Sequence, residues 1–358
     1  VMLSVALVVS LAVVGCAKPT PAPGPTPTPE QEVFKFTLAS CWEPINPLLK
    51  CDNYIADKCR EMSNGRLDIK VYPAGALMPA FEGFEAASSG AVEMSSTAPA
   101  YQAGKESAFC LCDCMPLYMC QQDMANWYYQ GGLELYNEIW KNYNVIGFSE
   151  AIFDLEAGFR SHVELRTPAD FEGKKFRIGC PESQELIKRW GGSVISLSGG
   201  EIYEAMQRGI VDAFEYMTPD VDWAMGFQEI AEYWCAPAWY QTGVLYASLM
   251  NLDAYNSLPN DLKAIYEEAC KSCTMEFNTY FNVQSAIGTK NFIDYGTKVI
   301  KLDESFWGPA EAEMVSIMEE RASENPVYAR VLKSQVDYLE SQIRTILWRC
   351  HYIFAGTK

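Results

Sequence analysis

Hydrophobic and polar residues alternate with a period of two where the folded part of the chain is expected to begin. The run VFKFTLAS (33–40) fits a half-buried strand, whereas apolar residues in 46–63 recur at helical spacing. A turn, strand and turn pattern follows at 64–75, and a helical pattern at 78–90 ends at a glycine. Strand and helix signals that alternate in this way are typical of α/β domains.

Two stretches of the chain share one form. FEAASSGAVEM (84–94) and YEAMQRGIVDA (203–213) both begin with an aromatic residue, Glu and Ala, have glycine at the seventh position, and continue into an apolar run. Gly90 and Gly209 would each take the left-handed conformation that ends a helix and turns the chain into a strand. The repeat predicts two lobes with related plans, and a cleft between such lobes is where a small ligand usually binds.

The order of these patterns predicts the lobe boundaries. We expect lobe I at 33–157 with a returning segment at about 243–257, and lobe II at 158–242 together with C-terminal helical segments. Residues 258–358 are predicted to form long helices that span both lobes, because the apolar residues near the end of the chain fall on one stripe. The expected fold class is α/β, with two lobes and a hinged cleft.

The charge of the chain limits its partners. The net charge is -18 over 358 residues, of which 49% are hydrophobic, so the chain is globular and its surface field is negative. Such a field repels nucleic acid and anionic lipid headgroups. No nucleic-acid partner is expected, and any anionic ligand must be held by a local positive site.

The amino-terminal residues have the pattern of a lipoprotein. Residues 1–15 are apolar and too few to span a bilayer comfortably, and Cys16 follows Val-Val-Gly. We predict a signal peptide over 1–15 and lipid attachment at Cys16, with a plain cleaved secretory peptide as the alternative. Residues 16–32 are rich in proline and would form an extended tether. The expected location is extracytoplasmic, periplasmic or at the cell surface, with a lipid anchor in the membrane.

Arg177 lies in a strand-like run, KKFRIG, with apolar surroundings. A guanidinium cannot lose its proton, so burying it is costly unless an anion meets it. The pattern predicts an anion-binding cleft, with a structural ion pair to a nearby Asp or Glu as the alternative.

Six motifs in order resemble one family of receptors. The chain is similar to the solute-binding receptors of tripartite ATP-independent periplasmic (TRAP) transporters over roughly 34–325. The motifs are GRLDIKVYPAGAL, SSGAVEM, AYQAGKE, FRSHVELRTPADFEGKKFRI, GGEIYEAMQRGIVDAFEY, and APAWYQTG with LPNDLKAIYEEA after it. The resemblance implies a two-lobed periplasmic solute-binding protein fold that closes over a small organic acid and delivers it to membrane permease subunits. It implies no enzymatic activity.

The resemblance also implies roles for particular residues. Arg177 would clamp the ligand carboxylate, which suits the fork of a guanidinium. The motifs look most like the branch that binds 2-oxo or 2-hydroxy acids, such as pyruvate or lactate, with a metal ion. In that branch Glu215, the carbonyl of Tyr216, and Gln241 would be metal ligands, and oxygen ligands of this kind suit Na⁺ or Ca²⁺. The alternative is that Glu215 bonds only to backbone or ligand and no metal binds.

Two departures from that branch change the expected metal site. Tyr216 stands where Trp is usual, and the earlier loop has FDLEAGFR in place of a Gln-containing run. Asp154 or Glu156 would then serve as the missing ligand, and an added carboxylate favours a divalent ion.

Aromatic side chains are the expected walls of the cleft. Trp42, Tyr101 and Tyr216 are predicted to contact the ligand, and Phe153 is a further candidate, although such residues are as often part of a core. Arg160 would offer a second positive charge to a dicarboxylate.

The cysteines are not explained by the resemblance. Thirteen are present, and setting Cys16 aside leaves twelve, an even number that suits disulfides in an oxidising compartment. One cluster consists of Cys110, Cys112, Cys114 and Cys120, and Cys270 and Cys273 form a second pair. On an extended segment the CxCxC spacing would place thiols on one face, where a soft metal or an Fe–S cluster is conceivable. The alternative is a set of free, buried thiols.

Three functions follow from these patterns. The first is a lipid-anchored receptor for an organic acid, the second an extracytoplasmic metal or redox protein with Cys ligands, and the third a sensor that uses the receptor fold. His162 and His351 have no motif that would make either catalytic.

Overall fold

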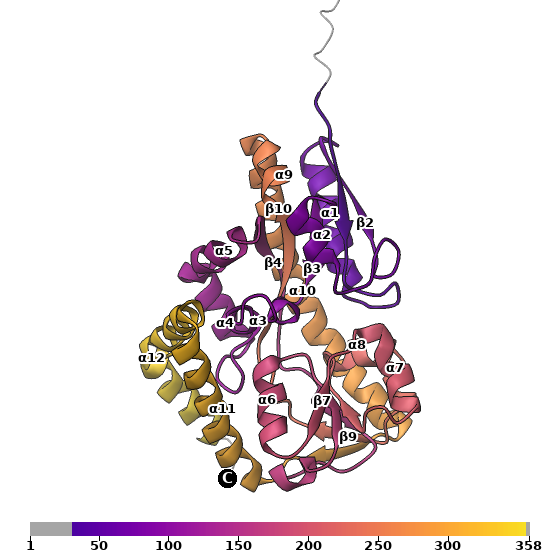
Figure 1. Ribbon diagram of the computed structural model, residues 1–358, viewed down its shortest axis with the longest axis vertical. Helices are drawn as coiled ribbons and strands as arrows, with labels where there is room; N and C mark the ends of the chain where they lie inside the picture. The colour runs from indigo at the N-terminus through magenta and orange to yellow at the C-terminus, as the bar shows by residue number, and fades with distance from the viewer. Residues whose placement is uncertain (1–30, 356–358) are drawn as a thin grey trace, which may run out of the picture. The chain divides into compact units, whose positions relative to one another are not determined.

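The computed structural model describes residues 31–355, and side chains as far as Gln342. From Val33 onward the chain forms one unit (Figure 1). The predicted signal peptide, the lipid attachment at Cys16 and nearly all of the proline-rich tether lie outside the described residues. No helix among the described residues is both long and apolar enough to cross a bilayer.

The first sheet has five strands in the order β2-β1-β3-β10-β4. Its strands are β1 (Phe34–Ala39), β2 (Leu67–Tyr72), β3 (Met94–Thr97), β4 (Val145–Phe153) and β10 (Val244–Asn251). β1 pairs in parallel with β2 and β3, whereas β10 is antiparallel to β3 and β4. β10 is buried along its whole length because it enters the sheet between two strands from earlier in the chain.

The second sheet has six strands in the order β11-β9-β5-β8-β6-β7. Its strands are β5 (Phe159–Ser161), β6 (Lys175–Arg177), β7 (Ser193–Ile195), β8 (Ala213–Phe214), β9 (Tyr233–Ala236) and β11 (Lys298–Lys301). β6 pairs in parallel with β7 and β8, so the carboxyl ends of these strands meet at one edge, where Arg177 lies.

Short helices follow the strands of both sheets. The helices that accompany the strands of the first sheet are α1 (Leu49–Met62), α2 (Gly83–Ser89), η1 (Pro99–Gln102), α3 (Phe109–Asp113), α4 (Gln121–Trp127), η2 (Tyr128–Gly132), α5 (Leu133–Lys141) and α9 (Leu252–Ser257). The helices that accompany the strands of the second sheet are η3 (Pro168–Phe171), α6 (Pro181–Arg189), α7 (Gly199–Gln207), α8 (Pro219–Ala224) and η4 (Phe227–Glu229). Gly90 and Gly209 follow α2 and α7 with φ of 77° and 65°, the left-handed conformation expected of them. This alternation confirms the predicted α/β class.

Three long helices complete the fold. They are α10 (Asn260–Tyr295), α11 (Glu304–Glu324) and α12 (Pro326–Ala355). α10 packs on β4 of the first sheet and on α8 beside the second, and Figure 1 shows it running between them. α11 packs on α6, and α12 packs on α3 and α4. The prediction of helices throughout 258–358 missed β11, which joins the second sheet by pairing with β9.

The cysteine cluster differs from its expected conformation. Cys110 and Cys112 lie on α3, a short helix whose residues are all buried, so the extended segment that we expected is wrong. The apolar side chains around them form a core, which favours a helix because it satisfies the backbone hydrogen bonds locally. The eleven cysteines whose side chains the structure describes are all free.

Candidate functional site

Arg177 ends β6 with only 2% of its side chain exposed. Its Nη1 donates to the carboxylate of Glu215 at 2.8 Å and to the Glu215 carbonyl at 2.6 Å, and its Nε donates to the Leu197 carbonyl at 3.0 Å. Its Nη2 has a longer contact, 3.5 Å to the hydroxyl of Tyr101. Burial lowers the pKa of Arg177, but Glu215 outweighs it and the pKa is raised. One side of the guanidinium is thus neutralised and the other is not.

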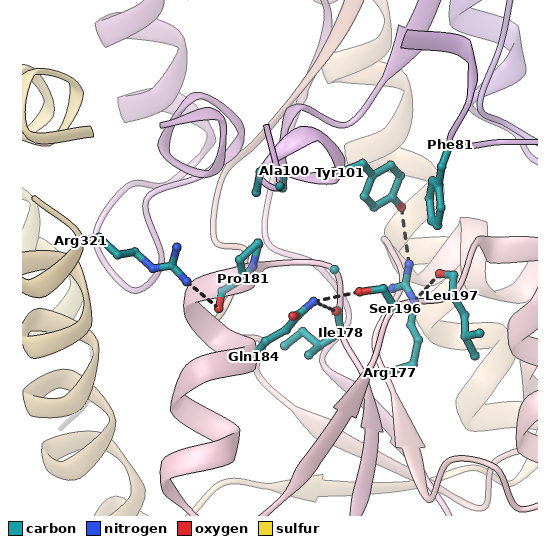
Figure 2. Close-up of a pocket in the computed structure, with 13 residues that line it drawn as sticks. Phe81, Ala100, Tyr101, Arg177, Ile178, Pro181, Gln184, Ser196, Leu197 and Arg321 are labelled. Carbon is teal, nitrogen blue, oxygen red and sulfur yellow. Dashed lines mark hydrogen bonds between the residues drawn. The ribbon is translucent and has the colours of Figure 1, made fainter. Parts of the chain in front are cut away.

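A cavity of about 390 Å³ opens beside Arg177 (Figure 2). Tyr101 on η1 and Phe81 line it from the first-sheet part of the chain, and Arg177 and the start of α6 line it from the second-sheet part. The other lining residues include Gln184, Ser196, Leu197 and Arg321. The sequence left two roles open for Arg177, a structural ion pair or a place in an anion-binding cleft. In the structure Arg177 both pairs with the carboxylate of Glu215 and borders a cavity.

Glu156 lies in the loop after β4, and backbone bonds hold this loop against two others. The Glu156 N–H donates to the Gln241 carbonyl at 3.2 Å, and the Ala157 N–H donates to the Met217 carbonyl at 2.9 Å. Glu156 is 2% exposed, and neither of its carboxylate oxygens has a hydrogen-bond partner. Burial, and then the nearby charge of Glu215, raise the pKa of Glu156 well above its usual range. An unpartnered buried carboxylate is costly, so this position calls for a proton or a cation.

The groups around Glu156 fit an oxygen-liganded cation. The Glu215 carboxylate accepts from Arg177 and from the Gly179 N–H. The amide nitrogen of Gln241 donates to Asp113 at 3.0 Å, which leaves its amide oxygen as the atom that could meet a cation. Among the described side chains, no three His, Cys, Asp or Glu residues are placed to hold one metal ion together. A cation here would therefore need amide and carbonyl oxygens besides the two Glu carboxylates, a set that suits Ca²⁺ or Na⁺.

Asp113 is a member of this group that the sequence analysis missed. It is 1% exposed and ends α3, and burial raises its pKa well above the usual range. An acidic residue inside the apolar run CLCDCM was the available signal, but the thiols on either side of it drew the interpretation toward soft metals. In the part of the chain that the structure describes, the clustered cysteines are not placed together as metal ligands, which the Cys-ligand alternative would require.

Tyr216 contacts Arg177 with its ring rather than with its hydroxyl. The ring centre lies 5.4 Å from the guanidinium carbon, a cation–π contact. The hydroxyl accepts from Asn46 at 2.7 Å and donates to Glu43 at 3.2 Å, and both of these residues follow β1. Tyr216 therefore joins the two sheet regions behind the cavity.

Three other predicted residues do not line the cavity. Trp42 is 1% exposed, and its indole N–H donates to Glu150 at 3.2 Å. Phe153 is 1% exposed and packs on Tyr246 and Phe281, as core residues do. Asp154 is exposed, so of the two acidic candidates in this loop only Glu156 points inward.

Arg160 is also placed away from the cavity. It is fully buried and donates from Nε to Asp222 at 3.0 Å. Its guanidinium carbon lies 4.1 Å from the ring centre of Trp234 and 3.8 Å from that of Phe292. Burial lowers its pKa, and burial raises the pKa of Asp222 to about 7 despite the attraction of Arg160. Its two terminal nitrogens are buried without a hydrogen-bond partner, and Arg160 is not among the residues that line the cavity beside Arg177. The expected contact of Arg160 with a dicarboxylate stays a prediction.

Arg321 is a cavity residue that the sequence did not suggest. It comes from α11, donates to the Pro181 carbonyl at 3.3 Å, and lies 3.8 Å from the buried carboxylate of Glu182. Its side chain is 26% exposed and lines the cavity at the end away from Tyr101 (Figure 2). No motif marked it, since a single Arg in an amphipathic helix resembles any solvated charge.

Comparisons with known proteins agree with this architecture. A family model described as bacterial extracellular solute-binding protein, family 7, matches residues 38–325. A curated relative from Nostoc sp., named a monocarboxylate 2-oxoacid-binding periplasmic protein, is 32% identical over 282 residues, which cover 77% of this chain and 76% of that protein.

Two solved structures are similar over nearly the same region. A TRAP periplasmic solute-binding protein from Colwellia psychrerythraea, with bound calcium and pyruvate, has a TM-score of 0.86 at 26% identity and covers 91% of this chain and 100% of that one. One from Pseudoalteromonas atlantica, with bound sodium and pyruvate, has a TM-score of 0.86 at 25% identity with the same coverage. The match to the family model over most of the chain and the relative above 30% identity agree on one assignment. The chain belongs to family 7 of the bacterial extracellular solute-binding proteins, the solute receptors of TRAP transporters.

Proposed function

We propose that this receptor binds a small 2-oxo monocarboxylate, such as pyruvate, in the cavity beside Arg177, together with a divalent cation. The observation that carries this proposal is a buried guanidinium with one side neutralised by Glu215 and the other side, Nη2, directed at a cavity. A carboxylate that replaced the long contact to Tyr101 would form a charge-assisted hydrogen bond, worth about 1.5–3 kcal/mol.

Charge balance supports a divalent ion. The positive charge of Arg177 is already matched by Glu215, so an ionised Glu156 and a ligand carboxylate would add two uncompensated negative charges. A divalent cation neutralises both, whereas Na⁺ neutralises one. Glu156, Glu215, the Tyr216 carbonyl and the Gln241 amide oxygen would hold the ion, and its positive charge would keep Glu156 ionised.

The ligand is released unchanged in this proposal. Hinged closure would bury the acid, and the closed receptor would dock on the membrane subunits of its transporter. A lipid anchor at Cys16 would keep the receptor near those subunits. Fold and family support these steps, and the anchor rests on the sequence pattern alone.

Isothermal titration calorimetry would test the ligand assignment. Pyruvate, lactate, 2-oxobutyrate and succinate would each be titrated into the chelator-treated protein with and without added Ca²⁺. We expect pyruvate and 2-oxobutyrate to bind more tightly than succinate, and only when Ca²⁺ is present. Binding of none of these acids, or tighter binding of succinate than of pyruvate, would contradict the assignment.

Two pairs of variants would test the residues. Arg177→Gln should weaken pyruvate binding by about 100-fold, since at least one charge-assisted bond is lost and Glu215 is left unpaired. Its control is Arg189→Gln, a partly exposed arginine with carboxylate partners on α11.

Glu156→Gln should weaken the response to Ca²⁺ by about tenfold or more, whereas Asp154→Asn, in the same loop but exposed, should leave it unchanged. Equal effects at Glu156 and Asp154 would remove Glu156 from the cation site.

A further inference from the structure

Two buried cysteines meet where α1 packs on α10. Cys51 is in the first turn of α1 and Cys273 is near the middle of α10, and each has 0% of its surface exposed. The two helices are in direct contact. The residues are far apart in sequence, so only the tertiary fold brings them together.

The contact between the two residues is close. The sulfur of Cys273 lies 3.5 Å from the carbonyl oxygen of Cys51, so the Cys273 side chain reaches the backbone that bears the other thiol. Cys51 is also the neighbouring group that most strongly raises the pKa of the Cys273 thiol. A disulfide joins residues whose Cα atoms lie about 4.4–6.8 Å apart, so two cysteines in contact across a helix–helix interface are candidates for one.

We propose that Cys51 and Cys273 form a disulfide in the mature receptor. The receptor works outside the cytoplasm, where oxidising conditions allow such bonds to persist. In the reaction the two thiols exchange with a disulfide oxidant: a sulfur–sulfur bond forms between Cys51 and Cys273. The oxidant takes up the two electrons and two protons as a pair of free thiols.

Other cysteines are less suited to pairing. Cys110 and Cys180 approach each other, but both lie at the carboxylate of Glu182, and the Cys180 thiol donates to that carboxylate at 3.5 Å. Cys112 has Asp113 and Glu106 as its charged or titratable neighbours and no thiol among them. Cys59 on α1 also raises the pKa of Cys270 on α10, but no hydrogen bond joins these two residues. Among the cysteines whose side chains are described, only Cys273 has its sulfur within hydrogen-bonding distance of another cysteine residue, Cys51.

The bond would form before the helices finish packing. Burial, and then the neighbouring Cys51, raise the pKa of Cys273 well above its usual range, so little thiolate exists in the folded protein. Once formed, the bond would tie α10, which also contacts α8, to the first-sheet region through α1.

Peptide mapping would test the proposal. The full chain would be exported to an oxidising periplasm, its free thiols would be alkylated under denaturing conditions, and the digest would be analysed by mass spectrometry without reduction. We expect one linked peptide containing Cys51 and Cys273, lighter by two hydrogens than the two reduced peptides. Two more thiols should react after reduction than before it.

Matched variants complete the test. Cys273→Ser should abolish the linked peptide, whereas Cys112→Ser, an equally buried thiol, should leave it unchanged. If the Ser variants fold poorly, the native digest is sufficient by itself. Full alkylation of Cys51 and Cys273 in the native protein, or linkage of either to another cysteine, would overturn the proposal. Pyruvate binding by unlinked protein would leave the proposed function intact.

Discussion

Replacement of Glu150 by Gln is expected to stabilise this protein at neutral pH. Glu150 on β4 and Asp52 on α1 are both 0% exposed, and no cation lies among the groups that perturb either one. Glu150 accepts from the Trp42 indole at 3.2 Å, and Asp52 accepts from Ser40 at 2.6 Å and Ser96 at 3.0 Å. The second oxygen of each carboxyl group, Oδ1 of Asp52 and Oε2 of Glu150, has no hydrogen-bond partner.

A proton shared between the two carboxyl groups would satisfy both of these oxygens, and each group perturbs the pKa of the other. Burial raises the pKa of Asp52 to about 6, and burial together with Asp52 raises the pKa of Glu150 well above its usual value of 4.5. The folded state therefore binds more protons than the unfolded state, so stability falls as pH rises above about 4. Keeping a proton at pH 7 on a group with an ordinary pKa of 4.5 costs about 3 kcal/mol, at 1.36 kcal/mol per unit.

The amide N–H introduced by Glu150→Gln could donate a hydrogen bond to Asp52 at any pH, whereas the wild-type carboxyl group can donate one only when it is protonated. Urea unfolding followed by circular dichroism should show Glu150→Gln equal to wild type at pH 4.5 and about 3 kcal/mol more stable at pH 7. The other buried acids titrate in both proteins and cancel in the difference. Glu276→Gln, on the exposed face of α10, should show no such pH dependence. A Glu150→Gln variant that is less stable than wild type by the same amount at both pH values would refute the shared proton.

Two further substitutions test packing away from the cavity. Asp222→Asn should cost about 3–5 kcal/mol in urea unfolding, because it leaves the buried Arg160 without its carboxylate; a cost below about 1 kcal/mol would mean that the aromatic rings alone stabilise the cation. Gly288→Ala should lower stability by about 1–3 kcal/mol, since a Cβ there would come within 2.6 Å of the Asp220 Cα on α8. Gly308→Ala, which meets no atom within 4 Å, is its control and should be neutral or stabilising in the same assay.

Local pattern was sufficient for the elements of this fold. The strands around Arg177 and the helices that end before Gly90 and Gly209 were predictable, since period and left-handed glycines depend on residues adjacent in sequence. The position of Arg177 at the end of a strand was predictable for the same reason, because the strand pattern depends on adjacent residues. The short strands of the second sheet, such as β8 and β11, were harder, because two to four residues in a sheet depend on the partners beside them.

The cavity itself was decided by tertiary structure. Arg160 and Arg177 both occupy short buried strands, and the strand pattern alone does not tell which of them borders a cavity. Arg160 is covered by Trp234 and Phe292, whereas Arg177 faces a space completed by Tyr101 and by Arg321 on α11. The sequence by itself determined the alternation of elements, the family and the buried cation on β6. Only the fold decided which charges are paired and which are left open, because the energy of a buried charge depends on neighbours that the chain brings from far away.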